Sequence, residues 1–111
     1  MSFRKNPELP APPYYAVIFV STRSKNLDGY NVMDDATIEK VKKLDGFLGF
    51  ENIKNGDEGI FISYWESMES INKWRNDTLH LEAKQKGQTM WYDKFLSQVC
   101  KVEQSREFIR K

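Results

Sequence analysis

The stretch from Tyr14 to Thr22 constrains the fold more than any other part of this 111-residue chain. Its β-branched and aromatic residues predict a buried strand. Side chains of a strand point alternately to two faces. Both faces are apolar here, with Ala16, Ile18 and Val20 on one and Tyr15, Val17 and Phe19 on the other. A sheet built around this strand therefore needs a cover on each side.

The next segments predict a helix and a hairpin. Apolar residues recur at helical spacing from Tyr30 to Leu44, with Asp28 as the expected cap at the start and Gly46 at the end. Strands are expected at 47–54 and 60–65, because the turn sequence of residues 55–59, Asn-Gly-Asp-Glu-Gly, lies between two apolar runs.

A second helical region and a final strand complete the pattern. Ser67 is expected to cap a helix with Met68, Ile71 and Trp74 on one face, and Asp77 or Thr78 restarts the helix in a new direction. The stripe that follows, at steps of three and four, consists of His80, Ala83, Gly87 and Trp91. Residues 95–103 return to a strand pattern.

The order strand, helix, strand, strand, helix, strand predicts a ferredoxin-like α+β fold. Its antiparallel sheet carries the helices on one face. The expected domain spans residues 14–105, between an extended arm at 1–13 that holds all four prolines and a charged tail at 106–111. Since the helices cover one face only, the apolar second face predicts a homodimer.

Composition narrows the class of function. The 17 basic and 16 acidic residues nearly balance, and no basic cluster exceeds Lys40, Lys42 and Lys43, so nucleic acid is not an expected partner. One Cys and one His argue against a protein-built metal site, and no dinucleotide fingerprint is visible. No segment is apolar and long enough to span a membrane, and the first residues do not form a signal peptide, so we expect a cytoplasmic protein.

His80 is the main candidate for chemistry, because it alone titrates near neutral pH without a shift. Small residues on its stripe either let the helix approach the sheet or leave a hollow. His80 is then either a polar group facing an aromatic cavity or a structurally satisfied histidine. The tryptophans also allow a structural and a functional interpretation. Trp65 is best interpreted as a core residue, whereas Trp74 and Trp91 could belong to the core or line a pocket. The acidic pairs Asp34-Asp35 and Asp57-Glu58 are attributed to a helix's polar face and a turn.

Four sequence features, in order, carry a family resemblance. They are the segment from Asp45 to Glu51 (Asp-Gly-Phe-Leu-Gly-Phe-Glu), Ser63-Tyr64-Trp65, the segment from Trp74 to His80, and Gly87 followed by Trp91-Tyr92. Together they make the chain, from Tyr14 to Glu103, resemble the antibiotic biosynthesis monooxygenase family of dimeric α+β barrels.

The resemblance implies a dimer packed sheet to sheet, with a pocket between sheet and helices in each subunit. It also implies oxidation of a small aromatic or quinol-type substrate without metal or flavin, since a deprotonated phenol reacts with oxygen itself. His80 would be the base, and the substrate-binding residues would be Trp74, Trp91, Trp65, Phe19 and Ser21.

Two other functions stay open. The haem-degrading branch of the family has a Trp where Trp74 stands, but Lys84 occupies the position of its haem-ligating His, and Ser21 and Thr22 stand in place of its Asn. The third possibility is a dimeric binding domain that holds an aromatic metabolite without converting it.

Overall fold

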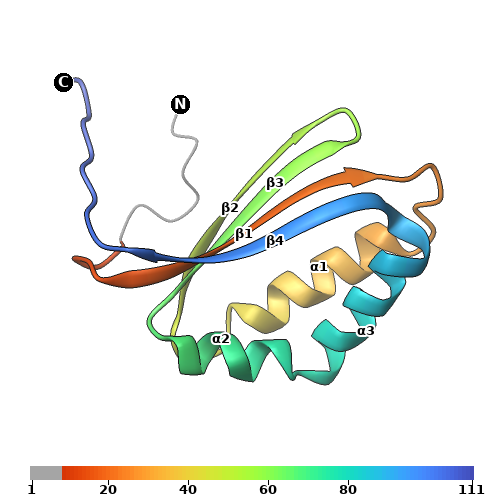
Figure 1. Ribbon diagram of the computed structural model, residues 1–111, viewed down its shortest axis with the longest axis horizontal. Coiled ribbons are helices and arrows are strands. Elements are labelled where there is room, and N and C mark those ends of the chain that lie inside the picture. The colour runs from red at the N-terminus through yellow and green to blue at the C-terminus, as the bar shows by residue number, and fades with distance from the viewer. Residues whose placement is uncertain (1–8) are drawn as a thin grey trace.

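The computed structural model describes residues 9–111, which form four strands, three α-helices and one π-helical turn in the order expected from the sequence (Figure 1). The elements are β1 (Tyr14–Arg23), α1 (Tyr30–Val41), β2 (Phe47–Asn55), β3 (Glu58–Trp65), α2 (Met68–Arg75), α3 (Thr78–Lys86), the π-helix η1 (Gly87–Trp91) and β4 (Tyr92–Val102). The expected arm at 1–13 falls mostly outside the described residues.

The four strands form one antiparallel sheet in the order β2-β3-β1-β4. All the helices lie against the same face of this sheet (Figure 1). The ferredoxin-like α+β fold predicted from the sequence is therefore confirmed. No helix in the described part of the chain is long and apolar enough to cross a membrane.

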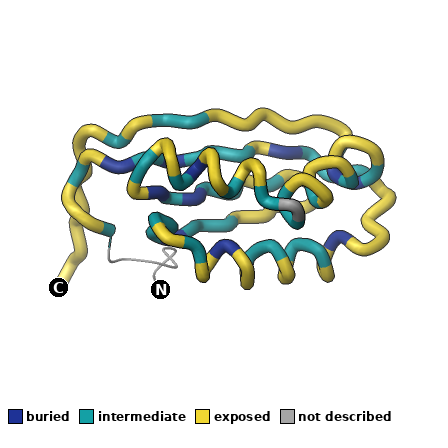
Figure 2. The backbone as a smooth tube through the Cα atoms, turned by 90° about the horizontal axis from the view of Figure 1, so that it is seen from below, coloured by how far each residue is buried: buried dark blue, intermediate teal, exposed yellow. Residues whose placement is uncertain are grey.

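Strand register divides the sheet into two faces. Val17 pairs with Ser63 and Val99, and Phe19 pairs with Phe61, so the odd-numbered residues of β1, β3 and β4 share the face that carries the helices. The core lies on this face, where Val41 of α1, Trp65 of β3 and Ile71 of α2 form a buried cluster. Seen from the helix side in Figure 2, the helices expose most of their positions and bury only a few.

The opposite face exposes a continuous apolar row. Ile53, Ile60, Val20 and Leu96 lie directly opposite one another on the four strands, and their exposed fractions are 55%, 43%, 41% and 54%. No helix within residues 9–111 covers this row (Figure 1). On this face of β1, Tyr14 and Ala16 are buried at one end of the strand, whereas Val20 is exposed toward the other end.

Several element boundaries differ from the sequence expectation. Gly29, not Asp28, stands at the N-cap of α1 and provides no side-chain cap. The α1 helix ends at Val41, and Gly46 instead turns the loop before β2, with φ of +85°. The hairpin is tighter than expected because Asn55 pairs with Glu58, so that only Gly56 and Asp57 form its turn. The caps at Ser67 and Asp77 are confirmed: their side chains accept hydrogen bonds from the backbone N–H groups of Ser70 and Leu79.

Candidate functional site

A cavity of about 590 Å³ lies between the sheet and the helices. Its floor is the helix-facing surface of the sheet, including Phe19 and Ser21 of β1 and Phe61 of β3. One wall is α1, and the other is the α2–α3–η1 segment. The volume is within the range of ~300–1,000 Å³ that is typical of small-molecule sites.

Local contacts fix His80 in the first turn of α3. The Asp77 carboxylate accepts a hydrogen bond of 2.9 Å from the Leu79 N–H, which caps the helix. Lys40 of α1 forms an ion pair with Asp77 at 3.0 Å and so ties the start of α3 to the other wall. The His80 ring stacks on Trp74 of α2, with 4.8 Å between ring centroids and 27° between planes. Both rings line the cavity.

The His80 ring is suited to accept a proton. Burial lowers its pKa below the ordinary 6.5, the backbone hydrogen bond with Arg75 opposes this, and the positive charge of Lys84 lowers it further. The imidazole is therefore neutral near pH 7. Its Nδ1 atom is buried and has no hydrogen-bond partner among the described residues. Buried polar atoms nearly always have a hydrogen-bond partner. This nitrogen is therefore available to accept a hydrogen bond from a ligand hydroxyl.

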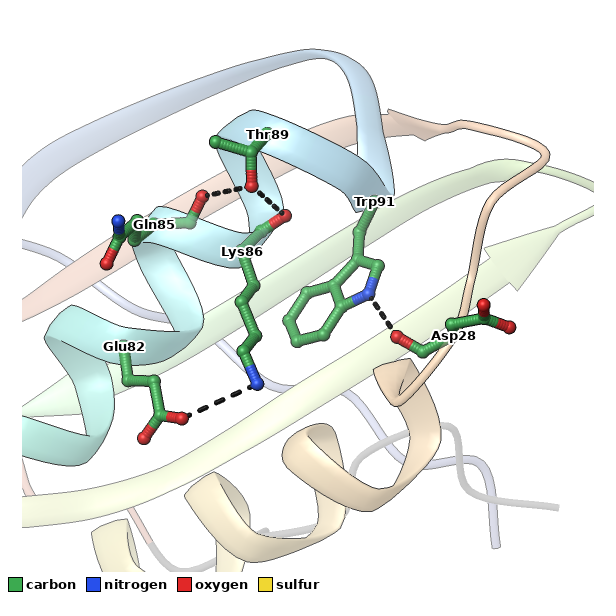
Figure 3. Close-up of polar contacts among 6 residues, drawn as sticks. All are labelled: Asp28, Glu82, Gln85, Lys86, Thr89 and Trp91. Carbon is green, nitrogen blue, oxygen red and sulfur yellow. Dashed lines mark hydrogen bonds and ion pairs between the residues drawn. The ribbon is translucent and has the colours of Figure 1, made fainter.

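Trp91 closes the far end of the cavity. It is 3% exposed, its indole N–H donates a 2.8 Å hydrogen bond to the Asp28 carbonyl (Figure 3), and its ring packs edge-on to Tyr30 at 5.6 Å. Gly87, one turn earlier, lets the helix pack closely on Tyr92, because a Cβ there would lie only 3.0 Å from the Tyr92 ring. The stripe expected from the sequence, His80, Ala83, Gly87 and Trp91, lines the cavity along its whole length.

A charged cluster lies at the same end as Trp91 and was not expected from the sequence. Lys54 of β2 approaches Asp34 of α1 at 3.9 Å and lies 5.1 Å from the centre of the Tyr30 ring. The Arg23 guanidinium at the end of β1 is 5.8 Å from the same ring. Burial and the neighbouring Tyr30 raise the pKa of the Tyr92 hydroxyl. All five side chains line the cavity.

The assignment of Asp34 to a solvated helix face was wrong. It is half-buried and lines the cavity, and burial raises the pKa of its carboxyl above the ordinary 3.8, while the charge of Lys54 opposes the shift. Its position four residues after Tyr30, on the same side of α1, was the signal in the sequence.

The candidate residues named from the sequence separate into two groups. His80, Trp74, Trp91, Phe19 and Ser21 all line the cavity. Trp65 lies outside the lining and belongs to the core cluster: it is 1% exposed, and its indole N–H donates to the Ser63 hydroxyl at 2.8 Å. Among the described residues, no three His, Cys, Asp or Glu side chains gather as metal ligands would.

Comparison with known proteins agrees with this architecture. The sequence profile of the family described as "Antibiotic biosynthesis monooxygenase" matches residues 13–86. The uncharacterized protein YqjZ of Bacillus subtilis is 44% identical over 100 residues, which are 89% of this chain and 88% of that protein.

Solved structures share the fold at low sequence identity. Rv0793 of Mycobacterium tuberculosis superposes with a TM-score of 0.74 at 14% identity, over 85% of this chain and 99% of that one. SnoaB, a cofactor-independent oxygenase of Streptomyces nogalater, gives a TM-score of 0.71 at 8% identity, over 85% and 97%. From the extent of the profile match and the identity to YqjZ, the chain belongs to the antibiotic biosynthesis monooxygenase family.

Proposed function

We propose that this protein is a cofactor-independent monooxygenase that oxidises a small aromatic, quinol-type substrate in the cavity between sheet and helices. The observation that carries the proposal is His80, a neutral imidazole with an unpartnered buried Nδ1, which lines an aromatic cavity. Family membership and the fold shared with SnoaB, a cofactor-independent oxygenase, support the same reaction class.

In the proposed reaction, His80 accepts the proton of a phenolic or enolic hydroxyl. The resulting anion is electron-rich at a ring carbon, which reacts with O₂. One oxygen atom stays on that carbon as a carbonyl, and the other leaves as water with the two hydrogens that the carbon carries in its keto tautomer. The substrate supplies all four electrons, so no external reductant enters the balance.

The surroundings of His80 favour this step in two ways. Trp74 stacks on the imidazole and fixes its plane, so that the ring does not need to reorient on binding. The lining is largely aromatic and apolar, so the substrate loses water on entry and its anion interacts more strongly with the nearby positive charges.

Oxygen uptake in the presence of a quinol, with His80 variants, tests the proposal. His80→Phe keeps a ring to stack on Trp74 but has no proton acceptor, and we expect kcat to fall by about 10²–10⁴-fold. Gln85→Ala, on the outward side of the same helix, is the matched control and should leave the rate unchanged. Treatment with a chelator should also have no effect. Full activity in His80→Phe would refute the role of His80.

The same assay addresses the alternatives. Tight binding of an aromatic ligand without any oxygen uptake would identify a binding domain that does not convert its ligand. A Soret band on addition of haem would point to the haem-degrading branch.

We further propose that the working form is a homodimer joined through the open face of the sheet. The exposed row of Ile53, Ile60, Val20 and Leu96 supports this, because contiguous exposed apolar patches on soluble proteins usually mark interaction sites. Sedimentation should give a dimer at micromolar concentration, and Leu96→Glu should shift it to monomer. A monomeric wild-type protein would contradict the proposal.

A further inference from the structure

The charges that line the cavity are unbalanced. Among the described lining residues, the cationic side chains are Arg23, Lys54, Arg75 and Lys84, and the one carboxylate is Asp34. The whole chain is close to neutral, so this excess of positive charge is local to the cavity. A cavity lined by one sign of charge attracts ligands of the other sign.

The excess is best placed to act at the Trp91 end. Arg23 is half-buried there, whereas Lys54, Arg75 and Lys84 are exposed to solvent, and a charge that is shielded from water interacts more strongly. Arg23 and Lys54 both approach the Tyr30 ring, at 5.8 and 5.1 Å, and both charges act on the Asp34 carboxylate, so the two cations lie at the same end of the cavity.

Asp34 offsets only part of the positive charge of this pair. Its contact with Lys54 is long, at 3.9 Å, and the structure gives it no closer ion pair with Arg23. The Arg23 guanidinium donates to the Gly56 carbonyl, a neutral group that anchors it to the hairpin turn, and its charge interacts with the same Asp34 carboxylate as that of Lys54. Two cations and one carboxylate leave a net positive charge at this end of the cavity.

The geometry points to the Arg23–Lys54 end of the cavity as the site that binds a carboxylate carried by the aromatic ligand. A guanidinium and an ammonium at the same end of a cavity are suited to a carboxylate, whose two oxygens can accept hydrogen bonds from both. The proposal rests on the proposed use of this cavity for an aromatic ligand and names the ligand's chemical class, an aromatic hydroxy acid.

This end also sets the orientation of the ligand. From His80 to Trp91 the wall runs along α3 and η1, which is roughly 15 Å at the helical rise per residue. A carboxylate held by Arg23 and Lys54 directs the opposite end of a polycyclic ligand toward Trp74 and His80. Binding at one end thereby selects which ring carbon reacts at the other.

The experiment compares two ligands that differ in one group, 6-hydroxy-2-naphthoate and 2-naphthol, by isothermal titration calorimetry. The wild-type protein should bind the naphthoate at least about tenfold more tightly. Lys54→Gln and Arg23→Gln should each remove most of this preference and leave the affinity for naphthol unchanged. Lys42→Gln, an exposed cation outside the cavity, is the control and should change neither affinity.

The Asp34→Asn variant controls for the possibility that the other variants lose binding because they fold poorly. Loss of the carboxylate removes a charge that repels the ligand, so the naphthoate should bind severalfold more tightly, a gain that misfolding cannot produce. Equal wild-type affinities for the two ligands would overturn the inference. It would also be overturned if Arg75→Gln or Lys84→Gln, in place of the Arg23 and Lys54 variants, removed the preference.

Binding and turnover are measured separately. A naphthoate preference without oxygen uptake from any quinol would uphold this inference and refute the proposed reaction. If the rate of oxygen uptake did not depend on a carboxylate on the substrate, the proposed reaction would be upheld and this inference refuted.

Discussion

Replacement of Gly46 by Ala tests how the loop before β2 positions the α2 helix. Gly46 has φ of +85°, and a Cβ at this position would lie 2.0 Å from Oγ and 2.7 Å from Cβ of Ser70. Rotation moves the Ser70 hydroxyl but not its Cβ, so the backbone must shift. Ser70 is in the first turn of α2, where its N–H donates to the Ser67 cap at 3.1 Å. The start of α2 must therefore move away from the loop.

Two costs add to the expected destabilisation. A non-glycine residue in the left-handed region costs about 1–2 kcal/mol, and overpacking of a well-packed site costs about 1–3 kcal/mol. The free energy of unfolding should then fall by about 2–5 kcal/mol, which corresponds to a decrease in Tm of at least roughly 10 °C. Thermal and urea unfolding followed by circular dichroism measure both quantities.

Gly56→Ala is the matched control. Gly56 also has positive φ, +63°, but a Cβ there would meet nothing within 4 Å. It should therefore show the backbone cost alone, and Gly46→Ala combined with Ser70→Gly should fall back toward that value. If Gly46→Ala proved no more destabilising than Gly56→Ala, the inferred clash with Ser70 would be refuted.

Three further predictions concern titration and packing. Because burial lowers the pKa of His80, the acid limb of kcat/KM should lie below pH 6.5, and a midpoint above 6.5 would contradict the assigned environment. Because the folded-state pKa of Asp34 is raised, its ionisation lowers stability as the pH rises from about 3.8 through the folded value. Asp34→Asn should therefore raise Tm at pH 7 but not at pH 3, and an equal change at both pH values would contradict this reasoning. Trp91→Phe removes the hydrogen bond to the Asp28 carbonyl and should lower the free energy of unfolding by about 0.5–1.5 kcal/mol, as measured by thermal unfolding. An unchanged Tm would show that this hydrogen bond does not contribute to stability.

The order of the elements and much of one cavity wall could be predicted from the sequence. Hydrophobic periodicity and caps are local properties, so the helix starts at Ser67 and Asp77 could be read directly. The spacing of His80, Ala83, Gly87 and Trp91 likewise defined one helical face, and that face lines the cavity. The uncovered apolar face of the sheet was also foreseeable, because alternation along β1 is visible in the chain.

The remaining residues of the site come together only when the chain folds. Arg23, Tyr30, Asp34, Lys54 and Tyr92 belong to four elements, β1, α1, β2 and β4, and strand register and helix docking bring them to one end of the cavity. No local pattern carries that information, because the contacts join residues far apart in the chain. Trp65 illustrates the same limit: its register opposite Tyr15 and Phe47 places it in the core, while Trp74 and Trp91 on the helical side line the cavity.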